Sequence, residues 1–315
     1  MTSTGPRQTA LHEHPDPADS AEADRPPCVL VFNASDPSGA GGLAADIGAI
    51  ASVGAHALPI VTGAYTRDTA EILDHHAFDE EAVSEQARTV LEDVTAQVIK
   101  VGFVGSIENI SAIAEIAADY ADIPLIAYMP DLSWWSEVQI DLYLDAFRDL
   151  MLPQTTVLVG NHSTLCRWLL PDWKADKSPG PRDVARAAHA FGVAYTLVTG
   201  IAQPEHRIEN VLASPQSVLF SGRFDRLGAG FSGAGDTLTG ALAALLATES
   251  DLGDAVREAL SYLDRSLESG FRPGMGHLVP DRLFWAQPEP DSDSEDNPDD
   301  SSDLRIDFPD HDTKH

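Results

Sequence analysis

The sequence predicts an α/β fold with a mainly parallel central sheet. Three observations lead to this prediction. Short apolar runs bounded by turn residues recur along the chain, as expected of buried parallel strands. Amphipathic segments of helical period separate these runs, so strand and helix alternate. The 315 residues are 43% hydrophobic, which is enough to bury one large core.

The expected elements follow in chain order from the apolar run Cys28 to Phe32, which precedes an Ala-rich helix over Leu43 to Val53. Further strands are expected at Ala57–Val61, Val98–Val101, Leu125–Tyr128, Thr156–Val159 and Tyr195–Val198. Amphipathic helices are expected at Glu80–Asp93, Ile107–Tyr120, Val138–Leu150 and Pro181–Phe191. Two β-rich pieces within Val211–Phe224 flank Ser214-Pro215 and predict a hairpin before the last helices. This alternation predicts right-handed βαβ units with helices on both faces of the sheet.

One folded domain is expected over residues 27–286. Residues 1–26 are rich in Pro, Asp, Ala and Ser without periodicity, which predicts a disordered leader. Residues 287–315 are rich in Asp and Glu among Ser and Pro, and they predict an acidic disordered tail. We interpret the tail as a solvating segment, with a specific interaction tail as the alternative.

Charge and composition narrow the class of protein. A formal net charge of −30 repels polyanions and argues against nucleic-acid binding. No apolar run approaches the roughly 18 to 20 residues of a membrane helix, and the N-terminus does not resemble a signal peptide. Cys28 and Cys166 lack metal-ligand spacing, so we expect two reduced structural cysteines. A cytoplasmic protein without membrane contact is predicted.

The strongest functional signal is the segment GAGFSGAGDT at residues 228–237, directly before an apolar helix over Leu238 to Ala247. Glycines ahead of a helix let several backbone N–H groups converge on one anion, and the helix dipole adds attraction. A phosphoryl group would suit this anion hole. Asp236 beside it is either a general base for an attacking hydroxyl or an ordinary helix N-cap.

A second loop, NASDPSGAGG at residues 33–42, follows the first strand and precedes a helix that contains Asp46. It has the spacing of neither a Walker A loop nor a dinucleotide-binding fingerprint. It either approaches a small substrate or forms a plain turn capped by Asp36 or Ser38.

Together these loops resemble hydroxymethylpyrimidine and phosphomethylpyrimidine kinases of the thiamin pathway. The first loop is similar to their Gly-Ser-Asp-Pro-Ser-Gly-Gly-Ala-Gly segment, and the second to the Gly-Ala-Gly-Asp signature of the ribokinase-like superfamily. Similar residues also occur at Ala45-Asp46, Lys100 to Phe103, Leu152-Pro153 and Gly274 to His277. The resemblance implies a ribokinase-like three-layer αβα fold.

The resemblance also implies ATP-dependent phosphorylation of hydroxymethylpyrimidine, of its monophosphate, or of both, in thiamin biosynthesis. It implies ATP and Mg²⁺ as cofactors, a small-molecule alcohol as acceptor, and a homodimer. Gly233, Ala234 and Gly235 would form the anion hole, and Asp236 would be the base, at a position where the pyrimidine kinases usually carry cysteine. Acceptor contacts are implied for Asp36, Gly41, Asp46 and Arg67, and nucleotide contacts for Asn161, Thr199, Gly200 and Ser232.

Several residues depart from the family pattern. Arg67 replaces a glutamine that contacts the pyrimidine, and Thr164 replaces the glutamate of an Asn-x-x-Glu segment. Thr199 replaces a lysine near the phosphates, and Tyr128 replaces an aspartate, although Asp131 is close by. The metal ligands are therefore left unassigned. Two alternatives stay open: a kinase with another acceptor alcohol, pyridoxal-like or sugar-like, and a degenerate relative that binds nucleotide or pyrimidine without turnover.

The two tryptophans and Arg67 each allow a functional and a structural interpretation, whereas the histidines are interpreted as structural only. Trp134 and Trp135 either line the mouth of the acceptor pocket or cover a loop. Arg67 either binds the acceptor or is a surface arginine paired with Asp68 or Glu71. His56 and the pair His75-His76 have no metal spacing and are interpreted as surface or loop histidines.

Overall fold

The computed structural model describes residues 25–248 and 250–286. The chain divides into one unit over residues 1–284 and a second over residues 285–315, and the first unit contains all the elements discussed below. The predicted acidic tail and nearly all of the predicted leader lie outside the described residues. Within the described part, no helix is both long and apolar enough to cross a bilayer.

The first unit is built on one nine-stranded sheet with the order β3-β2-β1-β4-β5-β6-β7-β8-β9. The strands from β2 to β7 in this order pair in parallel, and β3, β8 and β9 are antiparallel. Their bounds are β1 Cys28–Ser35, β2 His56–Arg67, β3 Ile72–Ala77, β4 Val98–Val101, β5 Leu125–Met129, β6 Val157–Asn161, β7 Tyr195–Gln203, β8 Arg207–Ala213 and β9 Val218–Asp225. The predicted mainly parallel sheet is confirmed.

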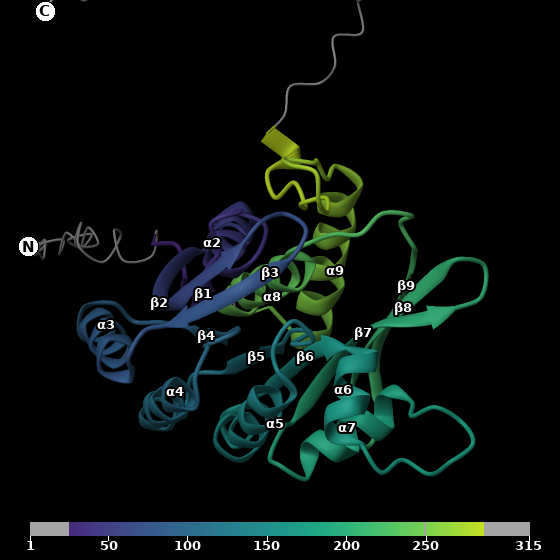
Figure 1. Cartoon of the computed structure of the whole chain (residues 1–315), viewed down its shortest axis with the longest axis horizontal. Helices are drawn as coiled ribbons and strands as arrows, with labels where there is room; N and C mark the ends of the chain where they lie inside the picture. Colours follow the sequence, from purple (N-terminus) through teal and green to yellow (C-terminus); the bar gives the residue numbers. More distant parts are fainter. Residues whose placement is uncertain (1–24, 249, 287–315) are drawn as a thin grey trace, which may run out of the picture. The chain divides into compact units, whose positions relative to one another are not determined.

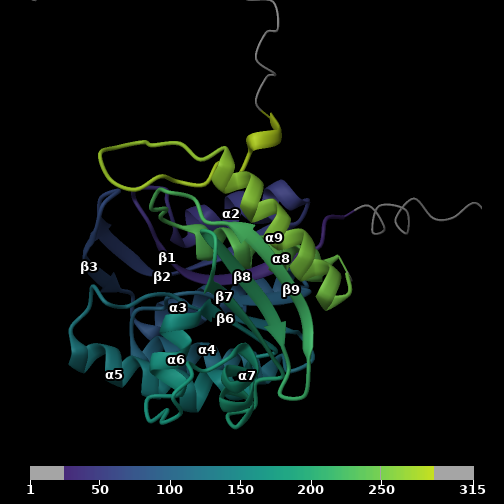
Figure 2. The same ribbon diagram turned by 90° about the vertical axis from the view of Figure 1, so that its right-hand side faces the viewer.

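Helices cover both faces of this sheet (Figures 1 and 2). One face carries α2 (Gly42–Val53), α8 (Ala234–Ala247) and α9 (Leu252–Glu268), and the other carries α3 (Glu80–Asp93), α4 (Ile107–Asp119), α5 (Glu137–Ala146), α6 (His162–Leu169) and α7 (Pro181–His189). Side chains alternate along β1. Val29 and Val31 therefore pack under α2, α8 and α9 on one face, and Leu30 and Phe32 pack under α3 to α7 on the other. The predicted three-layer αβα fold is confirmed.

Local signals explain where several helices begin. Asp79 accepts a hydrogen bond from the Ala82 N–H at the start of α3, and Ser106 accepts one from the Asn109 N–H at the start of α4. Gly54 ends α2 in the left-handed conformation that glycine adopts freely. These caps leave few polar backbone groups at the buried ends of the helices unpaired.

The hairpin formed by β2 and β3 is the main element that the sequence patterns did not predict. The expected strand ended at Val61, but β2 continues to Arg67 and pairs with β3 in antiparallel register. The sequence ILDHHA of β3 mixes polar and apolar side chains, and most of them are exposed. A half-exposed edge strand lacks the apolar run by which the buried strands are recognised. The hairpin β8–β9 is confirmed, with its turn at Ser214-Pro215.

Candidate active site

The loop that follows β1 packs directly against the N-terminus of α8. Gly233, the N-cap of α8, has a φ of 84°, and a Cβ at this position would collide with the carbonyl oxygen of Ala40. Arg282 holds the same contact, because its Nε donates to Thr237 Oγ1 (2.9 Å) and its guanidinium also reaches the carbonyls of Gly39 and Ala40. The two glycine-rich loops singled out in the sequence therefore form one site.

Asp236 lies in the first turn of α8, and its carboxylate faces the first loop. Its Oδ1 accepts hydrogen bonds from Lys100 Nζ and Asn33 Nδ2, both at 2.9 Å. Its Oδ2 accepts one from the backbone N–H of Gly42, also at 2.9 Å. Since Gly233 is the N-cap of α8, Asp236 does not cap its own helix, and the capping alternative is wrong. The carboxylate instead meets the first N–H group of α2.

Lys100 lies fully buried between two carboxylates. Its Nζ is 2.8 Å from Asp46 Oδ1 and 2.9 Å from Asp236 Oδ1. Burial raises the pKa of Asp46 to about 6, although the Lys100 charge opposes this shift. Burial by itself would lower the pKa of Lys100, but the charges of Asp236 and Asp46 outweigh it and raise that pKa. Lys100 is therefore charged at neutral pH.

Asp46 supports the site from behind. Its side chain is fully buried, and besides Lys100 it accepts a hydrogen bond from Asn33 Nδ2 at 2.8 Å. Asn33 thus bridges Asp46 and Asp236, as Lys100 does. A group with no exposed surface cannot reach an acceptor directly, so the structure gives Asp46 a supporting role rather than the expected acceptor contact.

Asp36 organises the first loop and binds Arg67. Its Oδ1 accepts from the Ser38 N–H, and its Oδ2 accepts from the Gly41 N–H (2.7 Å). Arg67 Nη1 lies 3.3 Å from the same Oδ2, and Nη2 donates to Ser232 Oγ at 3.3 Å. The Arg67 side chain is only 9% exposed, so it is not a surface arginine, although its Nε also donates to the Asp68 carbonyl at 3.0 Å. Arg67 links the β2–β3 hairpin to the anion-hole loop.

An aromatic cluster lies beside Arg67, between the β2–β3 hairpin and the loop after β5. Phe103 is at its centre, with ring centroids of Tyr65, His75, Trp134 and Trp135 between 4.9 and 5.7 Å away. His75 packs against Gly105, where a Cβ would clash with its ring, and burial lowers the pKa of His75 to about 4. The interpretation of His75 as a surface or loop histidine is wrong.

Both tryptophans are packed into this cluster and also border cavities. Trp134 and Trp135 stack at 5.4 Å and line a cavity of about 360 Å³ together with Asp74 and His75. Trp135 also lines a cavity of about 430 Å³, which contains Asp131 and the nearly buried Thr164. Both tryptophans therefore pack in the aromatic cluster and border cavities, and their contact with an acceptor stays a prediction.

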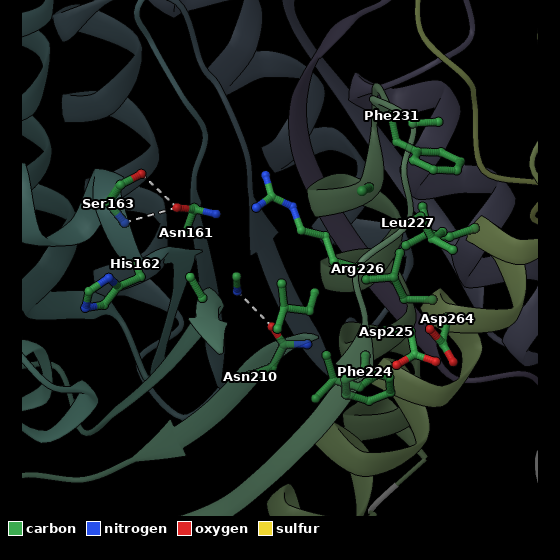
Figure 3. A pocket seen from close by; sticks show the side chains of 18 residues that line it. Asn161, His162, Ser163, Asn210, Phe224, Asp225, Arg226, Leu227, Phe231 and Asp264 are labelled. Atoms are coloured by element: carbon green, nitrogen blue, oxygen red, sulfur yellow. Dashed lines mark hydrogen bonds between the residues drawn. The ribbon is translucent and has the colours of Figure 1, made fainter. Parts of the chain in front are cut away.

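A larger cavity of about 680 Å³ opens on the other side of the anion hole (Figure 3). It is lined by Asn161, His162, Ser163, Gly200, Ala202, Ile208, Asn210, Phe224, Asp225, Arg226, Leu227, Ala229, Phe231, Ala234, Leu260, Leu263, Asp264 and Leu267. Strands β6 to β9, the start of α6, the loop between β9 and α8, the start of α8, and helix α9 supply these residues. The cavity therefore joins the anion hole at Ala234.

The predicted nucleotide residues divide between this cavity and its surroundings. Asn161 and Gly200 line it, and the Gly200 N–H donates to Asn210 Oδ1 at 2.9 Å. Thr199 lies behind them and donates to the Gly160 carbonyl. Ser232 faces the opposite side, toward Arg67 and His277. Of the expected set, Asn161 and Gly200 thus border the cavity, Thr199 lies behind it, and Ser232 points away from it.

Around the predicted anion hole, sequence reasoning noted Tyr128 only as a departure from the family pattern, and it missed Arg282 and Arg226. A Cβ on Gly235 would lie 2.0 Å from the hydroxyl oxygen of Tyr128, so this tyrosine packs against the predicted anion hole. Arg282 bridges the two loops from near the end of the folded unit. Arg226 lines the large cavity. Its position two residues before the glycine-rich segment was the one local signal available for either arginine.

The described residues do not assemble an evident metal site. They contain no group of three or more His, Cys, Asp or Glu side chains that could hold an ion together. The carboxylates nearest the anion hole are already bound: Asp236 and Asp46 by Lys100, and Asp36 by Arg67. The donor set of this site therefore does not fit a metal ion held by protein ligands alone.

Comparisons with known proteins agree on one group. The sequence model of a family described as phosphomethylpyrimidine kinase matches residues 36–281. A hydroxymethylpyrimidine/phosphomethylpyrimidine kinase of Streptomyces coelicolor is 27% identical over 83% of this chain and 96% of its own length. Its namesake in Mycobacterium tuberculosis is 29% identical over 82% of this chain and 94% of its own length.

Solved structures show the same fold at low identity. The ADP complex of pyridoxal kinase from Bacillus subtilis has a TM-score of 0.74 and 18% identity, covering 82% of this chain and 98% of that enzyme. A phosphomethylpyrimidine kinase from Clostridium difficile has a TM-score of 0.63 and 18% identity, covering 77% of this chain and all of that structure.

Proposed function

Because the chain belongs to the phosphomethylpyrimidine kinase family, we propose that it transfers the γ-phosphoryl group of ATP to the hydroxymethyl oxygen of hydroxymethylpyrimidine, of its monophosphate, or of both. The chain is a phosphotransferase that acts on an alcohol group, and its function belongs to thiamin biosynthesis. The observation that carries the proposal is the position of Asp236. Its carboxylate lies in the first turn of α8, beside the N–H groups that would hold the phosphoryl group.

The first turn of α8 supplies the electrostatic part of the proposed reaction. The initial N–H groups of a helix have no partner within the helix, so those of Ala234 and Gly235 are available to an anion. These amides and the helix dipole stabilise the negative charge on the transferring group. Placing such donors before the reaction begins avoids the cost of reorganising water around that charge.

Asp236 supplies the proton acceptor. Its Oδ1 already receives two hydrogen bonds, whereas Oδ2 receives one, from Gly42, and retains a lone pair. In the proposed step the acceptor oxygen bonds to the γ-phosphorus, the bond from that phosphorus to the bridging oxygen of ADP breaks, and the hydroxyl proton moves to Asp236. Lys100 and Asn33 keep the carboxylate in the orientation that this transfer requires.

We place the nucleotide in the cavity of about 680 Å³ that reaches Ala234, with Asn161 and Gly200 among its contacts. The volume is in the range of ordinary small-molecule sites. Mg²⁺ normally reaches such sites with the nucleotide and uses few protein ligands, and we assign none here. Thr199 and Ser232 act behind and beside the nucleotide in this proposal.

Arg67 favours a second candidate function, a kinase with another acceptor alcohol. Where the family has a glutamine, the Arg67 guanidinium spans Asp36 and Ser232. The neighbouring space is packed with Tyr65, Phe103 and Trp134. Both features change the surface that an acceptor would meet, so a pyridoxal-like or sugar-like alcohol is the alternative substrate. Asp36 and Gly41 would shape the acceptor loop in either case.

The test is ADP release with ATP, Mg²⁺ and a panel of hydroxymethylpyrimidine, its monophosphate, pyridoxal and small sugars. We expect Asp236→Asn to lower kcat at least about 100-fold, because the amide cannot take the proton. Asp254→Asn removes an exposed carboxylate from α9 and is the matched control, with activity expected to stay at the wild-type level. An Asp236→Asn variant within a few-fold of wild type would refute the assignment of the base.

The acceptor panel separates the candidates. Turnover of a pyrimidine alcohol supports the first function, and turnover of pyridoxal or a sugar alone supports the second. ATP binding without turnover of any compound would indicate a degenerate nucleotide-binding relative. We further propose a cytoplasmic homodimer, which light scattering during size-exclusion chromatography would test by its mass.

A further inference from the structure

We propose that Arg226 binds the phosphate groups of the nucleotide and supplies the positive charge of the large cavity. The inference rests on the proposed function, since it assumes a phosphate-bearing ligand there. Arg226 is the first residue after β9, and it is exposed and lines the cavity. Figure 3 shows its guanidinium extending across the cavity toward Asn161.

The other cations near the anion hole are committed to protein partners. Lys100 is held by Asp46 and Asp236, and Arg67 by Asp36. Arg282 is occupied by Thr237 and two backbone carbonyls. By contrast, no hydrogen bond or ion pair to the Arg226 guanidinium occurs within residues 25–248 and 250–286. It is also the only Arg or Lys among the described residues that line the cavity.

The cavity otherwise repels an anion. Asp225 and Asp264 both line it, so its acidic side chains outnumber Arg226 by two to one. Burial, together with the charges of Glu268 and Asp225, raises the pKa of Asp264, which reflects the negative potential at that end. The chain as a whole carries a formal charge of −30. A nucleotide with several negative charges therefore needs a local cation to bind well.

The position of Arg226 selects the phosphates rather than the base as its target. In Figure 3 the guanidinium lies well apart from Asp225, Asp264 and Phe224, and on the side of Asn161. The N-terminus of α8, which attracts anions, meets the cavity at Ala234. An arginine fork can donate two parallel hydrogen bonds to phosphate oxygens, and it keeps its charge at any physiological pH.

The experiment compares ATP and adenosine binding by isothermal titration calorimetry, using the full chain. Arg226→Gln should weaken ATP binding on the order of 10-fold to 100-fold, the effect of losing a charge-assisted contact to phosphate. Adenosine affinity should stay unchanged, because adenosine carries no phosphate. Arg226→Lys should fall between wild type and Arg226→Gln, since it keeps the charge and loses the fork.

Arg223→Gln is the matched control. Arg223 lies near the end of β9, three residues before Arg226. Its side chain is 63% exposed and pairs with Glu209, so the variant loses one positive charge outside the cavity. It should bind ATP like wild type. Equal ATP affinity in Arg226→Gln and wild type would overturn the inference, as would an equal loss in Arg223→Gln, or wild-type protein that binds neither ligand. ATP binding that depends on Arg226, without phosphoryl transfer to any alcohol, would support the inference and refute the proposed function.

Discussion

Lys100 limits what the two carboxylates beside it can do. Two carboxylates and one ammonium group leave a net negative charge in a buried cluster. The energetic cost of burying the charges of Asp46 and Asp236 is therefore offset by Lys100 alone among the charged groups of this cluster. The same contact fixes Asp236 in one orientation toward the anion hole. A carboxylate with so little exposure needs a close cation, and Lys100 Nζ lies 2.9 Å from Asp236 Oδ1.

His75 makes the stability of the fold depend on pH. Burial lowers its folded pKa to about 4, from 6.5 in an unfolded chain, so the unfolded state binds more protons between these values. Stability is therefore fully present above about pH 6.5 and is lost as the pH falls toward 4. We expect protonation of this histidine to lower the free energy of unfolding by about 2 kcal/mol between pH 7 and pH 5.

The measurement is urea unfolding of wild type and His75→Phe at pH 7 and pH 5. The variant should lose less stability on acidification, by about the amount given above, whatever its stability at pH 7. His76→Phe is the control, because that side chain is 72% exposed and meets similar solvent in both states. An identical acid loss in wild type and His75→Phe would contradict the buried position of His75.

At the scale of elements, the junction between the first loop and α8 depends on one glycine. Gly233 has a positive φ and lies directly against the Ala40 carbonyl, whereas Gly39 has a similar φ of 69° and nothing within 4 Å of a Cβ. Gly39→Ala should therefore cost only the conformational strain of about 1–2 kcal/mol. Gly233→Ala should cost more, and it should also lower ADP release, because the anion hole must open to admit the methyl group.

Chemical denaturation and kcat for both variants check this prediction together. The pair separates backbone strain from steric conflict. Both glycines have a positive φ, but only at Gly233 would a methyl group meet a neighbouring backbone. If Gly39→Ala and Gly233→Ala lose equal stability and both keep activity, the close packing of the two loops is not needed for function.

Local patterns were sufficient for most elements and for the two loops that meet at the candidate site. The helix Glu80–Asp93 and the strand Val98–Val101 have the predicted bounds, because a cap or an apolar run marks each end. The glycine-rich segment before α8 could also be identified from the sequence, because its glycines directly precede an apolar helix. Strand β3 was missed, since an exposed edge strand has mixed polarity. The contacts of Arg282 and the place of Arg226 in the large cavity could not be predicted, because they depend on segments that meet only after the chain folds.

At the scale of the whole molecule, the excess of acidic residues is spread over the chain rather than confined to its end. Residues 287–315 contain 11 Asp and Glu and two Lys and Arg, which leaves a formal charge of −21 on residues 1–286. Such a charge favours solubility, and it makes the compact state repel itself at low salt. A cation such as Arg226 therefore has more influence on anion binding here than it would in a neutral protein.

The composition of residues 287–315 predicts that they add solubility rather than stability. They hold few large apolar side chains, so ordering them would cost more conformational entropy than their burial could offset. Removal of residues 287–315 should leave the free energy of unfolding within about 0.5 kcal/mol of the full chain at moderate salt, as expected for changes away from packed structure. Urea denaturation of the two proteins at about 0.15 M salt, where longer-range repulsion is screened, is the measurement. A large loss of stability on truncation would contradict this prediction. The acidic sequence instead favours a truncated protein that is less soluble but equally stable.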